Sequence, residues 1–225
     1  MKLNRKAYLM QRIQLAASRG TVTRYVSGEL DDWATAARFM RKMRDRYETY
    51  LKPDTKSKRR RAGVATVDFW VYERPAAIEG KAPFWWVLLV SEGKGRVVEA
   101  ERLIPLQPEG AARSKRLELD GYELVHDGVG WSWQMSRATV SRWHEQIRRV
   151  CSAPPGRRDR VRAEKLIADM SRTPGFRLAR RQVGHLLARF RSEWRRLRAE
   201  IDPMPELPTF LPYVRMLPKR KRSER

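Results

Sequence analysis

Hydrophobic and polar positions follow two different periods along this chain of 225 residues. Apolar residues recur three or four positions apart in 3–18, 31–51 and much of 137–201, which predicts amphipathic helices. Between them, 64–72 and 84–91 are nearly continuous apolar runs, typical of strands that are covered on both faces. We therefore expect an α+β protein in which a β-rich middle is flanked by helices.

Shorter segments complete the β-rich part. The β-branched run 21–26 predicts a strand, and so do 115–119, 122–126 and 131–135. The last two are joined by Asp127-Gly128-Val129-Gly130, a sequence that favours a hairpin turn.

Three other segments have no strand pattern. We expect a short helix at 99–106 and an exposed basic loop at 56–61, after Lys52–Pro53 ends a helix. The proline-rich 202–218 predicts an extended strap.

The C-terminal helices are expected at 137–151, 158–170 and 177–201. The last has one apolar stripe, formed by Val183, Leu186, Leu187, Phe190, Trp194, Leu197 and Ile201. Its remaining surface carries a row of arginines, at positions 180, 181, 189, 191, 195, 196 and 198. Such a row suits phosphate, because a guanidinium is a planar fork of donors that keeps its charge. A solvated helix face is the alternative interpretation.

The formal net charge of +23 is unevenly distributed. Lys and Arg outnumber Asp and Glu by 17 to 6 in 1–62 and by 18 to 6 in 137–201, whereas 63–136 has 8 against 11. Two basic parts around an acidic middle favour a groove or clamp for an anionic partner such as nucleic acid. No apolar run is long enough to span a membrane, and we expect a cytoplasmic protein.

The histidines, the single cysteine and the glycine-containing turn 92–95 do not match the spacing of known metal or nucleotide sites. His126, His144 and His185 lack metal-ligand spacing, and the single cysteine, Cys151, excludes a site built from several cysteines. The turn 92–95 lacks the spacing of a nucleotide-binding loop. We therefore expect no metal and no cofactor, and a structural role for each histidine.

The order of strand 21–26, helix 31–51, strands 64–72 and 84–91 and a return through 115–126 is compatible with a ferredoxin-like β-α-β-β-α-β unit. Its second helix would be 99–106. With arginine-rich additions, the chain resembles the repeat-processing endoribonucleases of CRISPR systems, above all the basic version of type IV, mobile-element-borne systems, which has a helical finger. The residues that carry this resemblance are Gly20-Thr21-Val22-Thr23-Arg24, Arg38, Arg59-Arg60-Arg61-Ala62-Gly63 and the helical block 137–201.

The resemblance implies a protein that binds the repeat stem-loop of precursor CRISPR RNA, cleaves at the hairpin base without metal and stays bound in an effector complex. In that reaction the 2′-hydroxyl attacks the adjacent phosphate. Many members use a histidine near the first helix of the unit, but this sequence has none before His126. By position, Arg24 and Arg38 are the expected catalytic residues, and His126 is the runner-up.

The proposed division is a ferredoxin-like body (1–136 and 202–218), an arginine-rich helical subdomain (137–201) and a basic tail (219–225). A non-enzymatic DNA-binding accessory protein of a plasmid or mobile element remains the main alternative, and a ribosome-associated protein a weaker one. The expected RNA-binding residues are Arg41, Lys42, Lys58, Arg59, Arg60, Arg61, Arg157, Arg158, Arg160, Arg177, Arg180, Arg181, Arg189, Arg195, Lys219 and Arg220.

Overall fold

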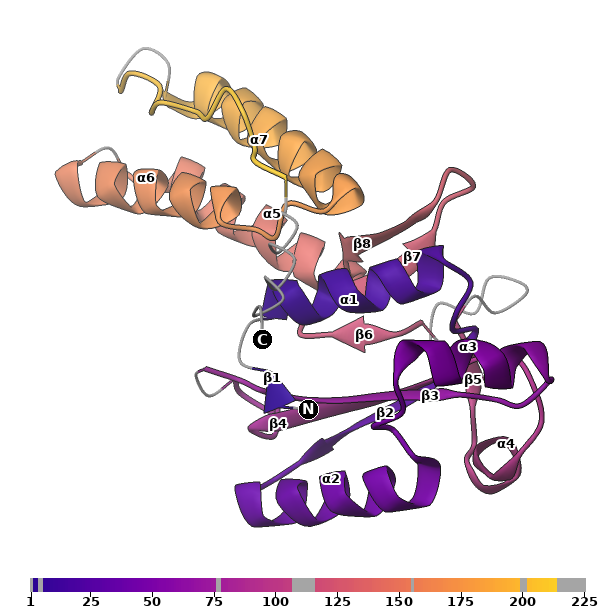
Figure 1. The fold of residues 1–225 in the computed structure, drawn as a ribbon. Coiled ribbons are helices and arrows are strands. Elements are labelled where there is room, and N and C mark those ends of the chain that lie inside the picture. The colour runs from indigo at the N-terminus through magenta and orange to yellow at the C-terminus, as the bar shows by residue number, and fades with distance from the viewer. Residues whose placement is uncertain are drawn as a thin grey trace, which may run out of the picture. The chain divides into compact units, whose positions relative to one another are not determined.

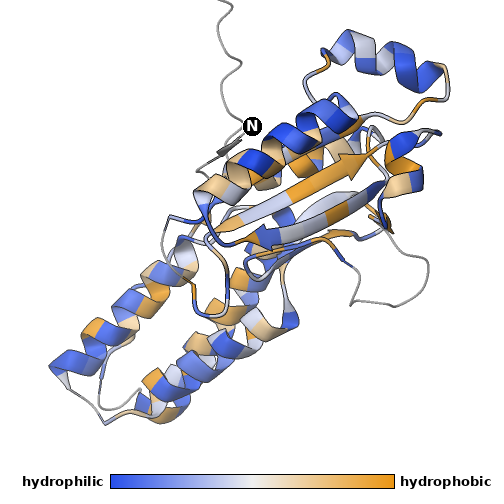
Figure 2. Ribbon diagram, turned by 90° about the horizontal axis from the view of Figure 1, so that it is seen from below, coloured by the Kyte–Doolittle hydropathy of each residue, from blue (hydrophilic) through white to orange (hydrophobic). Residues whose placement is uncertain are grey.

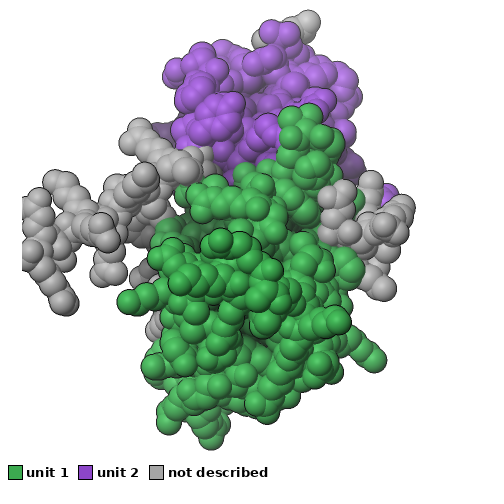
Figure 3. All heavy atoms as spheres, turned by 45° about the vertical axis from the view of Figure 1, so that its right-hand side comes forward, with its two compact units in different colours: residues 1–119, 124–131 green, residues 120–123, 132–225 purple. Residues whose placement is uncertain are grey.

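The chain folds into two compact units (Figure 3). The computed structural model describes residues 2–3, 6–75, 78–106, 116–154, 156–198 and 202–213. Unit 1 comprises Met1–Leu119 and Leu124–Trp131, and unit 2 comprises Asp120–Glu123 and Ser132–Arg225.

The main sheet of unit 1 has the ferredoxin-like strand order. Four antiparallel strands lie in the order β3-β4-β2-β5, and β1 (Lys2–Leu3) pairs in parallel with the outer edge of β3 (Figure 1). Helices α2 (Trp33–Tyr47) and α3 (Pro53–Arg61) lie between β2 and β3, and α4 (Arg96–Ala100) connects β4 to β5. This β-α-β-β-α-β connection confirms the predicted fold class. The strand bounds are β2 Arg24–Leu30, β3 Val67–Glu73, β4 Phe84–Val90 and β5 Ile104–Pro105.

The last part of this unit differs from the sequence-based expectation. The fourth strand is β5, only two residues long, and α4 precedes it. The segment that was expected to return to the sheet instead joins a second sheet, with strand order β6-β7-β8. These strands are β6 Glu118–Leu119, β7 Tyr122–His126 and β8 Trp131–Met135, and the predicted hairpin joins β7 to β8.

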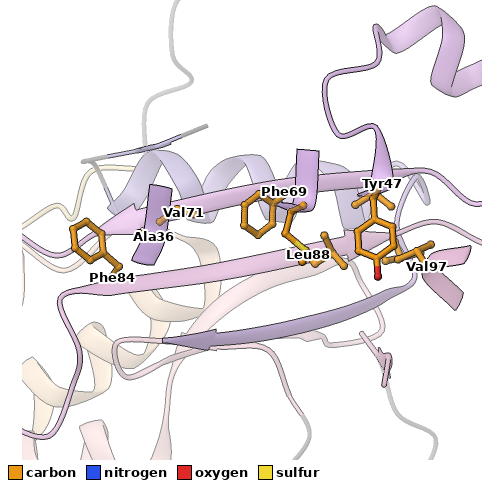
Figure 4. Packing of buried hydrophobic residues seen from close by; sticks show 10 residues of the cluster. Ala36, Tyr47, Phe69, Val71, Phe84, Leu88 and Val97 are labelled. Carbon is orange, nitrogen blue, oxygen red and sulfur yellow. The ribbon is translucent and has the colours of Figure 1, made fainter. Parts of the chain in front are cut away.

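Helix α2 covers one face of the main sheet. Asp32 caps it by accepting a hydrogen bond from the Thr35 backbone N–H at 2.8 Å. Its buried residues pack on β3 and β4, and the cluster includes Ala36, Met43, Tyr47, Val67, Phe69, Val71, Phe84, Leu88 and Val90 (Figure 4). The aromatic and methionine residues of this helix therefore belong largely to the core, although Trp33 is 48% exposed.

Helix α1 (Lys6–Ser18) lies on the opposite face of the sheet from α2 (Figure 1). It buries Leu9, Met10, Ile13 and Ala17.

The basic segment 56–61 is helical, so the prediction of a loop was wrong. It forms most of α3 (Pro53–Arg61). Proline is favourable in the first turn because its missing N–H would be unpaired there, and the negative charge of Asp54 suits the positive end of the helix dipole.

Unit 2 contains α5 (Arg137–Ser152), α6 (Arg157–Ser171) and α7 (Arg177–Arg198), close to the predicted helices. Hydrophilic and hydrophobic positions alternate along these helices (Figure 2). The predicted stripe of α7 is confirmed over Val183, Leu186, Leu187, Phe190 and Trp194, which are all buried.

The strap after α7 contacts the helices of unit 2. The Trp194 indole donates to Asp202 O at 3.1 Å, and Arg180 Nε donates to Leu211 O at 2.7 Å. The sequence-based division had assigned 202–218 to the ferredoxin-like body. The described part of this segment, 202–213, is instead joined to α7 by these two hydrogen bonds. The expected basic tail, including Lys219 and Arg220, lies outside the described residues.

Candidate nucleic-acid interface

Two neighbouring cavities in unit 1 form a concave basic surface. Their volumes are about 480 Å³ and about 530 Å³, and both are lined by Arg12, Thr49, Asp68 and Trp70. We call them together the unit 1 cleft. Its further lining residues come from α1, α2, α3, β3 and the segments after α1 and α2: Leu15, Ala16, Arg19, Thr21, Ala37, Met40, Arg41, Arg44, Tyr50, Leu51, Pro53, Lys56, Arg60 and Phe69.

The charge of the unit 1 cleft is strongly positive. Its lining includes the basic side chains Arg12, Arg19, Arg41, Arg44, Lys56 and Arg60, against the single carboxylate of Asp68. That carboxylate is already paired, because Asp68 Oδ1 lies 2.7 Å from Lys56 Nζ. An anion in the cleft therefore meets an excess of positive charge.

Four of these arginines are exposed, and two lie over aromatic rings. The guanidinium of Arg44 lies 5.5 Å from the ring centre of Tyr50, and that of Arg12 lies 6.0 Å from the ring centre of Trp70. The Tyr50 side chain is 61% exposed, which leaves its ring accessible for stacking. Exposed guanidiniums beside accessible rings suit a ligand that has both phosphates and bases.

Lys56 and Arg60 have structural partners as well as a place in the cleft. Lys56 is buried and donates to Val67 O at 2.5 Å and to Asp68. It thereby binds a carbonyl of strand β3 and fixes α3 to the sheet. Arg60 donates to Thr66 Oγ1 at 3.3 Å.

The other expected RNA-binding residues of unit 1 divide into two kinds. Arg59 makes a double hydrogen bond to Glu48, at 2.6 and 3.1 Å, and this contact holds the pKa of Glu48 below its usual range. Lys42, Lys58 and Arg61 are exposed on α2 and α3. Of the candidates in this unit, Arg41 and Arg60 line the cleft.

The two expected catalytic arginines are not brought together by any contact. Arg24 begins β2, and its Nη2 lies 3.4 Å from Ser91 O and 3.6 Å from Glu92 Oε2. Arg38 is exposed on α2 and donates to Thr35 Oγ1 at 3.3 Å. Within the described part of the chain, no hydrogen bond or ion pair joins them, and neither lines the unit 1 cleft. Their catalytic assignment stays a prediction.

His126, His144 and Cys151 have structural surroundings, whereas His185 is exposed on α7. His126 Nδ1 accepts from the Gly128 N–H at 3.3 Å inside the β7–β8 turn. Burial, with Arg189 and Arg148 nearby, lowers the pKa of His144. Burial raises the pKa of Cys151 to about 11, which fits a packing residue rather than a nucleophile. Over the described ranges, no group of three or more His, Cys, Asp or Glu side chains is arranged to hold a metal ion.

The arginines of unit 2 also divide between structural and exposed positions. Arg157, Arg158, Arg177, Arg181 and Arg195 are exposed. Two further candidates, Arg160 and Arg189, lie close to carboxylates of the same unit. Arg160 pairs with Glu164 and Asp202, each at 3.1 Å, and Arg189 lies 3.9 Å from Glu193.

Arg198 is the largest departure from the expected phosphate-binding row of α7. It is only 2% exposed and donates to Cys151 O, Val150 O, Ala153 O and Pro154 O at the end of α5. Its charge is paired with Asp202 at 3.3 Å. This arginine therefore binds the carboxyl-terminal carbonyls of a helix instead of a ligand.

Sequence reasoning missed Arg12, Arg19, Arg44 and the two rings of the cleft. One signal was present: Arg12 and Arg19 are seven positions apart, which places them on the same side of a helix. The approach of this side to Tyr50 and to the end of α2 depends on tertiary packing.

Comparisons with protein-family models, with curated proteins and with solved structures found no match for this chain. None of the helices in the described residues is both long and apolar enough to cross a membrane.

Proposed function

We propose that this protein binds structured RNA, with the phosphate backbone in the unit 1 cleft. The observation that carries the proposal is the set of exposed arginines in the two cavities of the unit 1 cleft (12, 19, 41 and 44). Three of them, Arg12, Arg41 and Arg44, share a cavity with the exposed ring of Tyr50, and the one carboxylate of the cleft is already paired with Lys56. Arginines on phosphates and 2′-hydroxyls are the usual means by which proteins bind an A-form stem.

The RNA proposed is the repeat stem-loop of a precursor CRISPR RNA. The support is the ferredoxin-like strand order together with the resemblance carried by 20–24, Arg38, 59–63 and the basic helices of 137–201. Because one fold hosts many functions, the basic cleft supports RNA binding more strongly than the fold does. A cytoplasmic location and a place in a larger ribonucleoprotein complex are parts of the same proposal.

Cleavage, in this proposal, needs no metal. The 2′-hydroxyl attacks the adjacent phosphate, the bond to the 5′-oxygen breaks, and the products are a 2′,3′-cyclic phosphate and a 5′-hydroxyl. An arginine would stabilise the negative charge that develops on the phosphorane. Of the two, Arg24 suits this role better because it is partly buried and its guanidinium contacts Ser91 O and Glu92, whereas Arg38 is exposed.

Binding is tested with a repeat-type RNA hairpin and a DNA duplex of the same stem sequence, by fluorescence anisotropy. The variant R12Q/R41Q/R44Q removes three cleft arginines. If each contacts one phosphate, the loss at 0.15 M salt is about 100-fold, from a slope of about 0.9 per phosphate. The matched control R149Q/R162Q/R172Q removes as many charges, each already paired with a neighbouring carboxylate, and should bind like the unmodified protein.

Cleavage is tested in the same samples in the presence of EDTA. We expect a cut at the hairpin base that leaves a cyclic phosphate and is lost in R24A. Equal affinity for duplex DNA and hairpin RNA, with no cut, would contradict the proposal and favour the non-enzymatic DNA-binding alternative.

A further inference from the structure

A third cavity, of about 450 Å³, lies within unit 2 between α7 and the strap. One wall consists of α7 and carries Arg177, Arg180, Arg181 and Arg191. The other wall is the segment 207–213, which contributes the rings of Phe210 and Tyr213. No Asp or Glu is among its lining residues, so arginines are the only charged side chains of the described residues that line the cavity.

Arg180 is held in place in the wall of this cavity. Its Nε donates to Leu211 O at 2.7 Å, which fixes the plane of the guanidinium. That guanidinium lies 3.5 Å from the ring centre of Tyr213 and 5.4 Å from that of Phe210. The guanidinium of Arg180 and the rings of Phe210 and Tyr213 thus form a preorganised set of flat surfaces.

The two rings are unusually exposed for aromatic side chains that contact a helix. Phe210 is 64% exposed and Tyr213 is 61% exposed. Core packing therefore does not account for them, whereas base stacking requires accessible flat faces. Neighbouring Arg181 and Arg191 are exposed as well, at a position where they could neutralise phosphates.

We propose that this cavity binds an unpaired nucleotide next to the RNA stem, with its base stacked on the Phe210, Tyr213 and Arg180 surfaces and its phosphates against Arg181 and Arg191. The inference rests on the proposed RNA binding and adds a single-strand site to it. An acidic peptide would satisfy the arginines, but it would leave the two rings without a matching flat partner. The rings therefore favour a nucleotide.

The test uses three labelled probes: an unstructured oligouridine of twelve nucleotides, an abasic chain with the same number of phosphates, and a blunt-ended RNA hairpin. The unmodified protein should bind oligouridine about tenfold more tightly than the abasic chain, the size expected for stacking one base. The variant F210A/Y213A should lose that difference and keep its affinity for the blunt hairpin. W33A, which removes another exposed ring outside the cavities described above, should behave like the unmodified protein.

Two results would overturn the inference: equal binding of oligouridine and the abasic chain by the unmodified protein, or a preference for oligouridine that survives in F210A/Y213A. Displacement of oligouridine by polyglutamate at equal charge, with the same dependence on the two rings, would also overturn it and indicate a peptide site. Failure of the proposed RNA binding by the unit 1 cleft gives a different result from failure of this inference. In that case the unmodified protein would bind the blunt hairpin no more tightly than R12Q/R41Q/R44Q does.

Discussion

Replacing Arg198 by methionine should destabilise unit 2 without removing a ligand-binding charge. Methionine keeps much of the length and the apolar stem of the side chain, but it has no hydrogen-bond donor. The substitution leaves Cys151 O, Val150 O, Ala153 O and Pro154 O without the guanidinium that binds them. It also leaves Asp202 without its partner at 3.3 Å.

The expected loss follows from the burial of this arginine, which is 2% exposed. Breaking a buried ion pair by removing one partner costs about 3–5 kcal/mol. Asp202 keeps a second partner, Arg160 at 3.1 Å, so we expect a value near the lower end, about 3 kcal/mol.

Urea denaturation followed by circular dichroism measures this loss. R196M is the matched control, because Arg196 is exposed two positions away and pairs only with Glu193 in the described structure, at 2.6 Å. An exposed pair contributes at most about 1 kcal/mol. If R198M lost no more stability than R196M, the structural role of Arg198 would be refuted. Arg198 would then again be expected to bind phosphate together with the other arginines of α7.

Three further predictions concern stability and reactivity. G93A should lose about 1–3 kcal/mol in the same denaturation assay, since Gly93 has φ 128° and an added Cβ would lie 2.5 Å from Ala65 N; unchanged stability would contradict this. Burial raises the pKa of Tyr25 and of Tyr47 to about 12, so the neutral phenols stabilise the fold below pH 10 and this contribution is lost between pH 10 and 12. Denaturation at stepped pH should show that decline, and a smaller decline in Y47F would identify Tyr47 as one of its two sources. Cys151 should react with iodoacetamide at pH 8 only after denaturation, and rapid reaction of the folded protein would argue against its burial.

Strands β3 and β4 and helix α2 could be predicted because the sequence of each one favours, by itself, the structure that it has in the fold. The apolar runs in β3 and β4 and the period of α2 each identify their own element. β5 could not be found in this way, because a strand of two residues, Ile104–Pro105, has no period. It exists through its pairing with Arg24 and Tyr25 of β2, which is a long-range contact.

The helix α3 was missed because its own sequence opposes it. Lys58, Arg59, Arg60 and Arg61 crowd like charges into one turn, which favours an extended loop in isolation. Contacts outside the segment compensate: Arg59 pairs with Glu48, and Lys56 reaches β3. A sequence pattern does not contain those partners.

The sequence indicated where basic residues gather but not which of them remain available to a ligand. Charge segregation correctly indicated basic surfaces in both flanks, yet it could not separate Arg41, which lines a cleft, from Arg59 or Arg198, which bind the protein itself. A carboxylate or carbonyl partner distant in sequence decides the role of each arginine, and only the fold brings that partner close.

The most direct test of RNA binding by the unit 1 cleft is the affinity for a blunt RNA hairpin as a function of salt. We predict a steep linear fall of the logarithm of the binding constant with the logarithm of salt concentration, and a slope that is smaller by about 2.7 in R12Q/R41Q/R44Q than in the R149Q/R162Q/R172Q control. A binding constant that is nearly flat between 0.05 and 0.2 M salt, or an equal slope for the two variants, would contradict the account.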